Sequence, residues 1–171
     1  MTRVVLTGSE STGKSTLAAR LAEHYGAVLV PEFVRGFAVQ KGGEITFADH
    51  GPITKGQMAL EDELTLGVSG LIIQDTDLLS TVVYCRHYFG TCPAWILHEA
   101  SRRAPDLYLL CEIDLPWVAD GVRDRGDRRE EMQQLFRDAV AASGARFTTI
   151  LGSGDARFEA ALRAVDSLIE G

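Results

Sequence analysis

The chain has 171 residues, 46% of them hydrophobic and 24% charged, the usual mixture of one globular domain with a buried core. Its formal net charge of −7 argues against binding duplex nucleic acid, whose phosphates require a positive surface, but permits a local positive pocket. No apolar run approaches the roughly 20 residues that span a membrane, and the first residues lack the layout of a signal peptide. We expect one cytoplasmic domain over residues 1–171 whose cysteines are reduced thiols.

Short runs of aliphatic residues alternate with longer helical patterns along the chain, which predicts βαβ units around a parallel sheet. The expected strands are residues 3–7, 27–30, 71–75, 106–113 and 146–151. The expected helices are residues 14–25, 54–67, 76–90, 93–103 and 155–169, with Thr54 capping the second and Pro93 in the first turn of the fourth. Because the strands carry almost no charge, we predict a three-layer α/β fold with a five-stranded parallel sheet buried on both faces.

The loop after the first strand, GSESTGKST, contains the complete pattern G-x-x-x-x-G-K-[ST] between an expected strand and an expected helix. Two glycines let the backbone turn so that successive N–H groups point at one centre, beside the N-terminus of a helix. In this pattern Lys14 contacts the β- and γ-phosphates and Ser15 ligates Mg²⁺. We predict that a nucleoside triphosphate is bound by Gly8, Ser11, Thr12, Gly13, Lys14, Ser15 and Thr16.

Carboxylates follow two of the other strands, at the sheet edge where parallel sheets bind ligands. Asp75 closes the third strand, and we expect it to hold the water shell of Mg²⁺. Asp77 has two alternative roles, either accepting a hydrogen bond from a substrate hydroxyl or capping the next helix. Glu32 follows the second strand, and a helical turn would place Arg35 on the same face. This pair is either a surface ion pair or part of an acceptor site.

Phosphorylation of an alcohol needs a carboxylate within hydrogen-bond reach of the attacking hydroxyl. Glu32 and Asp77 are both candidates for this base, and the sequence does not choose between them. After the fifth strand, GSGDARF is a glycine-rich turn that either contacts a nucleotide base or simply connects strand and helix.

The segment PWVADGVRDRGDRREEM, residues 116–132, mixes four arginines with five acids. Such a mixture is typical of a solvated surface. Its position after the fourth strand, at the sheet edge of the phosphate loop, instead favours a lid over about residues 117–132. In this hypothesis Arg123 and Arg128 close over the transferring phosphate, and Arg129 is a further candidate.

Four motifs, GSESTGKST, PEFVR, QDTDLLST and PWVADGVR, resemble the ribosylnicotinamide kinase domain of the bacterial nicotinamide-nucleotide adenylyltransferase/ribosylnicotinamide kinase family. The resemblance runs from about Arg3 to Glu170. It implies a P-loop kinase fold with a helical lid, and phosphorylation of nicotinamide riboside by Mg²⁺ and ATP in NAD salvage. It also implies that the riboside is bound by Glu32, Arg35, Asp77, Trp117 and Asp120, with Trp117, Asp120 and Arg123 forming the lid-entry motif.

The chain also departs from this family. Larger members carry a DNA-binding segment and an adenylyltransferase domain, which do not fit within 171 residues, so we expect neither role here. Gly36 stands where the family often has an acid after the arginine of E-x-x-R, which affects the expected riboside contacts. The alternatives are a kinase for another nucleoside, a nucleotide or a small alcohol, and a nucleotide-dependent regulatory ATPase. The sequence does not predict ATP over GTP, or the oligomeric state.

Overall fold

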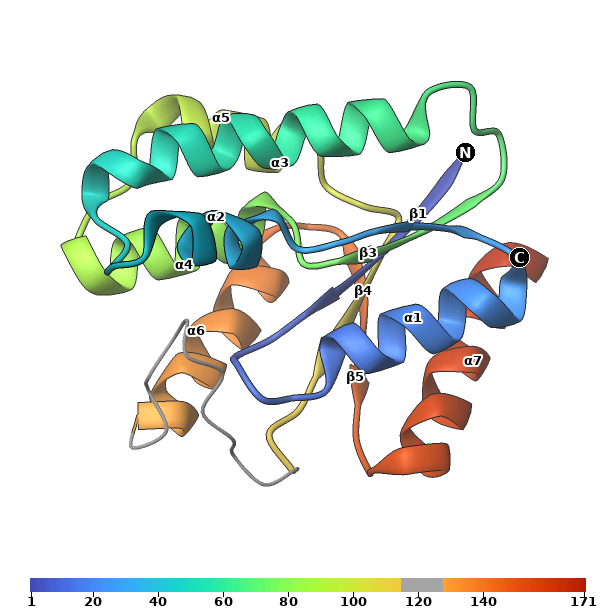
Figure 1. The fold of residues 1–171 in the computed structure, drawn as a ribbon. Coiled ribbons are helices and arrows are strands. Elements are labelled where there is room, and N and C mark those ends of the chain that lie inside the picture. Colours follow the sequence, from blue (N-terminus) through green and yellow to red (C-terminus); the bar gives the residue numbers. More distant parts are fainter. Residues whose placement is uncertain (115–127) are drawn as a thin grey trace.

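A computed structural model describes residues 1–114 and 128–171 and contains a five-stranded parallel sheet in the order β2-β3-β1-β4-β5 (Figure 1). All four strand pairings are parallel, with Val4 of β1 lying between Ile73 of β3 and Leu107 of β4. The predicted sheet is therefore confirmed. The strands are β1 (Thr2–Thr7), β2 (Val28–Val30), β3 (Leu71–Asp75), β4 (Leu107–Cys111) and β5 (Arg146–Ile150).

Helices cover both faces of the sheet. They are α1 (Lys14–Tyr25), α2 (Phe33–Lys41), α3 (His50–Thr65), α4 (Leu78–Phe89), α5 (Ala94–Arg102), α6 (Arg129–Ala142) and α7 (Gly154–Glu170), with a short 3₁₀ helix η1 (Phe47–Asp49) before α3. Helices α1 and α7 lie on one face, and α4 and α6 on the other (Figure 1). Helices α3 and α5 pack against α4, away from α1 and α7.

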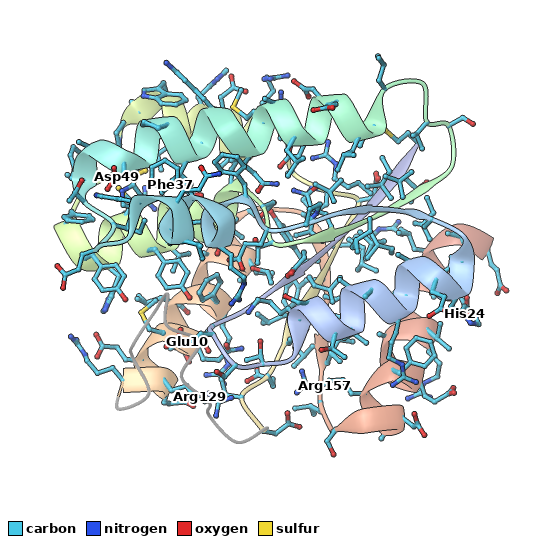
Figure 2. All side chains as sticks on the ribbon, viewed as in Figure 1. Glu10, His24, Phe37, Asp49, Arg129 and Arg157 are labelled. Atoms are coloured by element: carbon cyan, nitrogen blue, oxygen red, sulfur yellow. The ribbon has the colours of Figure 1, made fainter. Side chains whose placement is uncertain are left out.

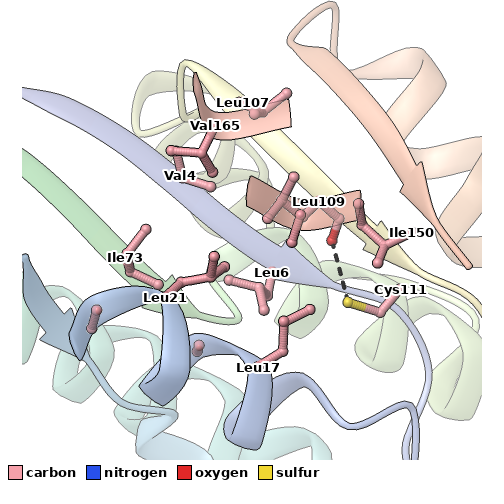
Figure 3. Close-up of a cluster of buried hydrophobic side chains, with 13 residues drawn as sticks. Val4, Leu6, Leu17, Leu21, Ile73, Leu107, Leu109, Cys111, Ile150 and Val165 are labelled. Carbon is pink, nitrogen blue, oxygen red and sulfur yellow. Dashed lines mark hydrogen bonds between the residues drawn. The ribbon is translucent and has the colours of Figure 1, made fainter. Parts of the chain in front are cut away.

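The core follows from the alternation of side chains along each strand. On β1, Val4 and Leu6 point toward α1 and α7, where they belong to one cluster with Leu17 and Val165 (Figure 3). Val5, between Val4 and Leu6, points to the other face, toward α4 and α6, where it belongs to a cluster with Phe136. Both faces are thus buried along β1, β3 and β4, as the nearly uncharged strands predicted, whereas the edge strand β5 is exposed except at Ile150, because only one strand borders it. Because β1 pairs in parallel with β3 and β4, the carboxyl ends of these three strands lie at the same edge of the sheet.

Three local features differ from the sequence expectations. Helix α3 begins at His50, so the prediction that Thr54 caps it is wrong: the Thr54 hydroxyl lies inside the helix and donates to the His50 carbonyl at 2.7 Å. Pro52 does not break this start, because the first N–H groups of a helix need no intrahelical acceptor. Helix α2 was expected only as a conditional turn. Helix α6 was not predicted at all.

The predicted lid overlaps the described structure only at its end. Residues 115–127 lie outside the described part of the chain, and with them Trp117, Asp120 and Arg123. The following residues 129–132 form the first turn of α6, where Met132 is fully buried. Among the described helices, none is both long enough and apolar enough to cross a membrane.

Replacing Gly36 with alanine is expected to stabilise the fold by about 1 kcal/mol, because Gly36 is exposed within α2 and an added Cβ meets nothing within 4 Å. Gly42 provides a matched control at the end of the same helix. Its φ of 68° favours glycine, so Gly42→Ala should destabilise instead. Urea denaturation measures both values, and the same sign for the two variants would contradict this account of α2.

Candidate active site

The phosphate loop connects β1 to α1 and approaches β4 very closely. Gly8 has a φ of 132°, and a Cβ added there would lie 2.6 Å from the Cys111 carbonyl oxygen. Only glycine fits both constraints. At the other end of the loop Gly13 has a φ of 74° and directly precedes the first residue of α1, Lys14. The two glycines of the sequence pattern therefore stand where the backbone needs them.

Three carbonyl groups of the loop accept hydrogen bonds from cationic side chains. The Ser9 carbonyl accepts from Lys14 Nζ at 2.6 Å, Ser11 from Arg129 Nη2 at 2.9 Å, and Thr12 from Arg157 Nη1 at 2.7 Å. The N–H and C=O groups of a trans peptide point in opposite directions. The N–H groups that follow these carbonyls therefore face away from the three cations. Backbone amides oriented in this way are the feature that binds phosphate in loops of this kind.

Arg157 joins three loops at this edge of the sheet (Figure 2). Besides the Thr12 carbonyl after β1, its guanidinium donates to the Glu112 carbonyl and the Asp114 carboxylate after β4, and to the Gly152 carbonyl after β5. The residue is only 3% exposed. The sequence analysis placed it in a glycine-rich turn of uncertain role and assigned it no function of its own.

Gln133 of α6 is a second residue that the sequence analysis missed. Its fully buried side chain accepts from the Ser9 N–H at 3.0 Å and donates to the Cys111 carbonyl at 3.1 Å. It therefore fixes the start of the loop against the end of β4. No motif marks this glutamine, because it lies in an ordinary amphipathic helix far along the chain.

Ser15 and Asp75 form the candidate metal site. The Ser15 hydroxyl donates to Asp75 Oδ2 at 2.5 Å, and Asp75 Oδ1 is buried with no hydrogen-bond partner among the described residues. Burial raises the Asp75 pKa above its ordinary value, as does the nearby Glu32 charge, whereas the Ser15 hydrogen bond, Lys14 and Arg35 oppose this. A serine hydroxyl beside an unpartnered carboxylate oxygen fits Mg²⁺, which takes few protein ligands and keeps waters and phosphate oxygens.

Glu32 and Arg35 form the predicted ion pair at the start of α2. Arg35 Nη2 lies 3.3 Å from Glu32 Oε2, and the two side chains differ in exposure, at 44% for Arg35 and 5% for Glu32. The Glu32 charge acts on Asp75, because β2 and β3 are neighbours, Asp75 ends β3, and Glu32 follows β2 by two residues. A buried carboxylate at this position can face an acceptor bound beside the phosphate loop.

Asp77 caps α4. Its Oδ1 accepts from the Leu79 N–H at 3.1 Å, and its Oδ2 accepts from the Tyr108 hydroxyl at 2.6 Å. Burial raises the Asp77 pKa from 3.8 to about 6, although these hydrogen bonds oppose the effect. Of the two roles that the sequence left open, the structure thus shows the helix cap, with each carboxylate oxygen in a hydrogen bond.

Arg128, the only lid arginine of the predicted catalytic set within the described residues, lies just before α6 and donates to Glu131 at 2.7 Å.

Asp77→Asn is expected to stabilise the fold near pH 7, because asparagine caps helices well and buries no charge. Because the Asp77 pKa is about 6 in the folded protein and 3.8 in the unfolded chain, the folded wild type keeps its full stability below pH 3.8. It loses on the order of 3 kcal/mol of this stability as the pH rises through about 6. The stability difference between variant and wild type should therefore grow from pH 4 to pH 7. Urea denaturation at both pH values measures it, and a pH-independent difference would contradict the prediction.

Comparison with known proteins identifies the family. A model of the AAA domain matches residues 3–157, which include the phosphate loop, Asp75 and Arg157. The chain belongs to this AAA domain family. Because its phosphate loop matches the nucleotide-binding pattern in full and stands in the matching structural context, we describe this AAA domain as a P-loop nucleotide-binding domain.

Two curated proteins are similar in sequence over most of the chain. The trifunctional NAD biosynthesis/regulator protein NadR of Escherichia coli (strain K12) is 29% identical over 153 residues, and that of Salmonella typhimurium (strain LT2) is 28% identical over 174 residues. The matches cover 86% and 98% of this chain but 37% and 42% of those proteins. The chain thus spans about two fifths of the length of these relatives. The resemblance inferred from the motifs is confirmed.

Solved structures share the fold of this AAA domain. A NadR protein in complex with NR gives a TM-score of 0.79 at 22% identity, covering 99% of this chain and 52% of that one. A NadR protein with NAD and AMP-PNP gives 0.77 at 20% identity, covering 99% and 50%. Thymidylate kinase from Ehrlichia chaffeensis gives 0.66 at 17% identity, covering 98% of both chains. The AAA domain therefore has an α/β P-loop kinase-like fold, as predicted.

Proposed function

We propose that this AAA domain transfers the γ-phosphoryl group of ATP to a hydroxyl of nicotinamide riboside, giving nicotinamide mononucleotide for NAD salvage. The observation that carries the proposal is the meeting of three strand ends: Lys14 after β1 and Glu32 after β2 both act electrostatically on Asp75 at the end of β3. This arrangement supplies a phosphate site, a metal site and a carboxylate for an acceptor. The substrate is suggested by the motifs that resemble the ribosylnicotinamide kinase family, by the sequence similarity to NadR, and by the NadR structure in complex with NR.

Each residue has a distinct part in this proposal. The loop amides and Lys14 would bind the phosphates and neutralise charge that develops on the γ-phosphoryl group. Ser15 and Asp75 would hold Mg²⁺, which when bound would supply positive charge that offsets the charge of the phosphates. Glu32 is the better candidate for orienting or deprotonating the hydroxyl, since both Asp77 oxygens already accept hydrogen bonds.

The remaining contacts involve the acceptor and the lid. Arg35, beside Glu32, would contact the riboside, and Asp77 would support this side of the site through α4. Arg128 and the residues outside the described structure, Trp117, Asp120 and Arg123, would close over the bound substrates. Closure excludes water, which otherwise competes with the acceptor for the phosphoryl group.

The test is ADP formation from ATP and Mg²⁺ with a panel of acceptors, followed by the mass of the product. We expect ADP formation that depends on nicotinamide riboside, and a product heavier than the riboside by one phosphoryl group. If only another nucleoside or a small alcohol supports turnover, the proposed substrate is wrong but the proposed kinase reaction stands. Equal ATP turnover with and without every acceptor would overturn the kinase and favour a regulatory ATPase.

A further inference from the structure

The first amide of α2 is capped by a side chain from another helix. Phe33 is the first residue of α2, so its N–H has no acceptor within the helix. Gln57 Oε1 of α3 accepts this N–H at 3.0 Å. Glu32 occupies the capping position, yet its side chain makes no capping hydrogen bond. Gln57 therefore performs the cap in place of Glu32, whose carboxylate pairs with Arg35 instead.

The orientation of the Gln57 amide is fixed by Glu61, one helical turn further along α3. Gln57 Nε2 donates to Glu61 Oε1 at 3.1 Å, and a carboxylate can only accept. The carbonyl end of Gln57 must therefore face Phe33. Glu61 is itself held from two sides, by Gln74 Nε2 of β3 at 2.6 Å and by Arg103 Nη1 at 3.2 Å. Gln57 is 5% exposed and Glu61 3% exposed, so this network is shielded from water.

A packing contact fixes the same point of α2. The Phe33 ring lies directly over Gly56, and a Cβ added at Gly56 would stand 2.1 Å from the nearest ring atom. Helices α2 and α3 thus meet closely at adjacent positions of α3, once through a ring and once through a hydrogen bond. Together these contacts place the peptide that joins Glu32 to Phe33.

We propose that Gln57, with Gly56 beside it, is a positioning residue for the acceptor half of the reaction, holding Glu32 at the correct place beside Asp75. The inference rests on the proposed function only in taking Glu32 as the group that meets the acceptor. Displacement of a catalytic group by about 1 Å can lower the rate about a hundredfold. The described hydrogen bonds of Gln57 and Glu61 go to Phe33, Gln74, Arg103 and each other rather than to the phosphate loop, so ATP binding should be spared.

The first test is Gln57→Met, which keeps the side-chain length and removes both hydrogen bonds. We expect kcat/KM for the acceptor to fall about 10- to 100-fold, while KM for ATP changes less than about twofold. Without any substrate, hydrogen exchange of the Phe33 amide should accelerate, because its acceptor has been removed. A purely structural glutamine would lower thermal stability without separating acceptor from ATP kinetics. Equal effects on both substrates, or unchanged exchange at Phe33, would overturn the inference.

A second test uses two glycines of α3. Gly56→Ala must displace the Phe33 ring and should lower kcat/KM for the acceptor in the same selective way. Gly51→Ala is the matched control, because its Cβ would meet only Trp95 at an ordinary 3.8 Å. Identical acceptor kinetics in the two alanine variants would count against the inference. If wild type phosphorylates a different acceptor, the proposed substrate is wrong. The role of Gln57 is then decided by the same comparison of variant and wild type, using kcat/KM for that acceptor and KM for ATP.

Discussion

Lys14→Met is expected to lower kcat for phosphoryl transfer about a thousandfold or more while the fold survives. Lys14 is 7% exposed, and its Nζ donates to the Ser9 carbonyl at 2.6 Å and to Thr12 Oγ1 at 3.2 Å. This holds the ammonium at the loop before nucleotide binds. Methionine has a similar length but cannot donate to phosphate, so charge on the γ-phosphoryl group would develop without this compensation.

The stability of the Lys14→Met protein should change little, because two effects oppose each other. The Ser9 carbonyl loses a partner, which costs about 1–3 kcal/mol, while a buried ammonium no longer has to be desolvated. ADP formation at saturating ATP and acceptor measures the loss in rate, and urea denaturation checks the fold. Lys55→Met in α3, where the side chain is exposed, is the matched control and should retain wild-type kcat. A Lys14→Met rate within about tenfold of wild type would refute this assignment of the phosphate site.

The elements that could be predicted from the sequence are those specified by neighbouring residues. Gly8, Gly13, Lys14 and Ser15 lie in one continuous pattern, so neighbouring residues alone identify them. The central strands β1, β3 and β4 were recognisable because both of their faces are buried, which leaves short runs with little charge. Asp75 follows from the same logic, since it closes such a run at the edge where the phosphate loop also lies.

The features that sequence reasoning missed depend on contacts between distant residues. Gln133 reaches Ser9 across 124 positions, and Gln57 reaches Phe33 across 24 positions. A glutamine in an amphipathic helix looks the same whether it faces water or a backbone group. The choice between the two roles of Asp77 likewise depended on Tyr108, 31 positions away on β4. Such residues become identifiable only when the sheet order brings the strand ends together.

Arg157 is the most distant of these contacts, 145 positions from Thr12, and its replacement is expected to have the largest effect on stability. Arg157→Met would leave the Thr12, Glu112 and Gly152 carbonyls without their shared donor at the ends of β1, β4 and β5. Removing one partner from a buried charged network costs about 3–5 kcal/mol. Urea denaturation measures this loss. Arg163→Met, at an exposed position of the same helix, should cost less than about 0.5 kcal/mol.

The same replacement should also weaken nucleotide binding, which separates a role in the site from a role in the fold alone. Once the Thr12 carbonyl is released, the loop amides no longer converge before the phosphates arrive, so binding must supply the ordering. We expect the affinity for ATP, measured by calorimetry at a temperature where the variant is folded, to fall at least about tenfold. Arg157→Lys keeps the charge but has only one nitrogen to donate to three loops. Its affinity for ATP should therefore lie between those of Arg157→Met and wild type. Wild-type ATP affinity in folded Arg157→Met would show that Arg157 holds the sheet edge together without organising the phosphate loop.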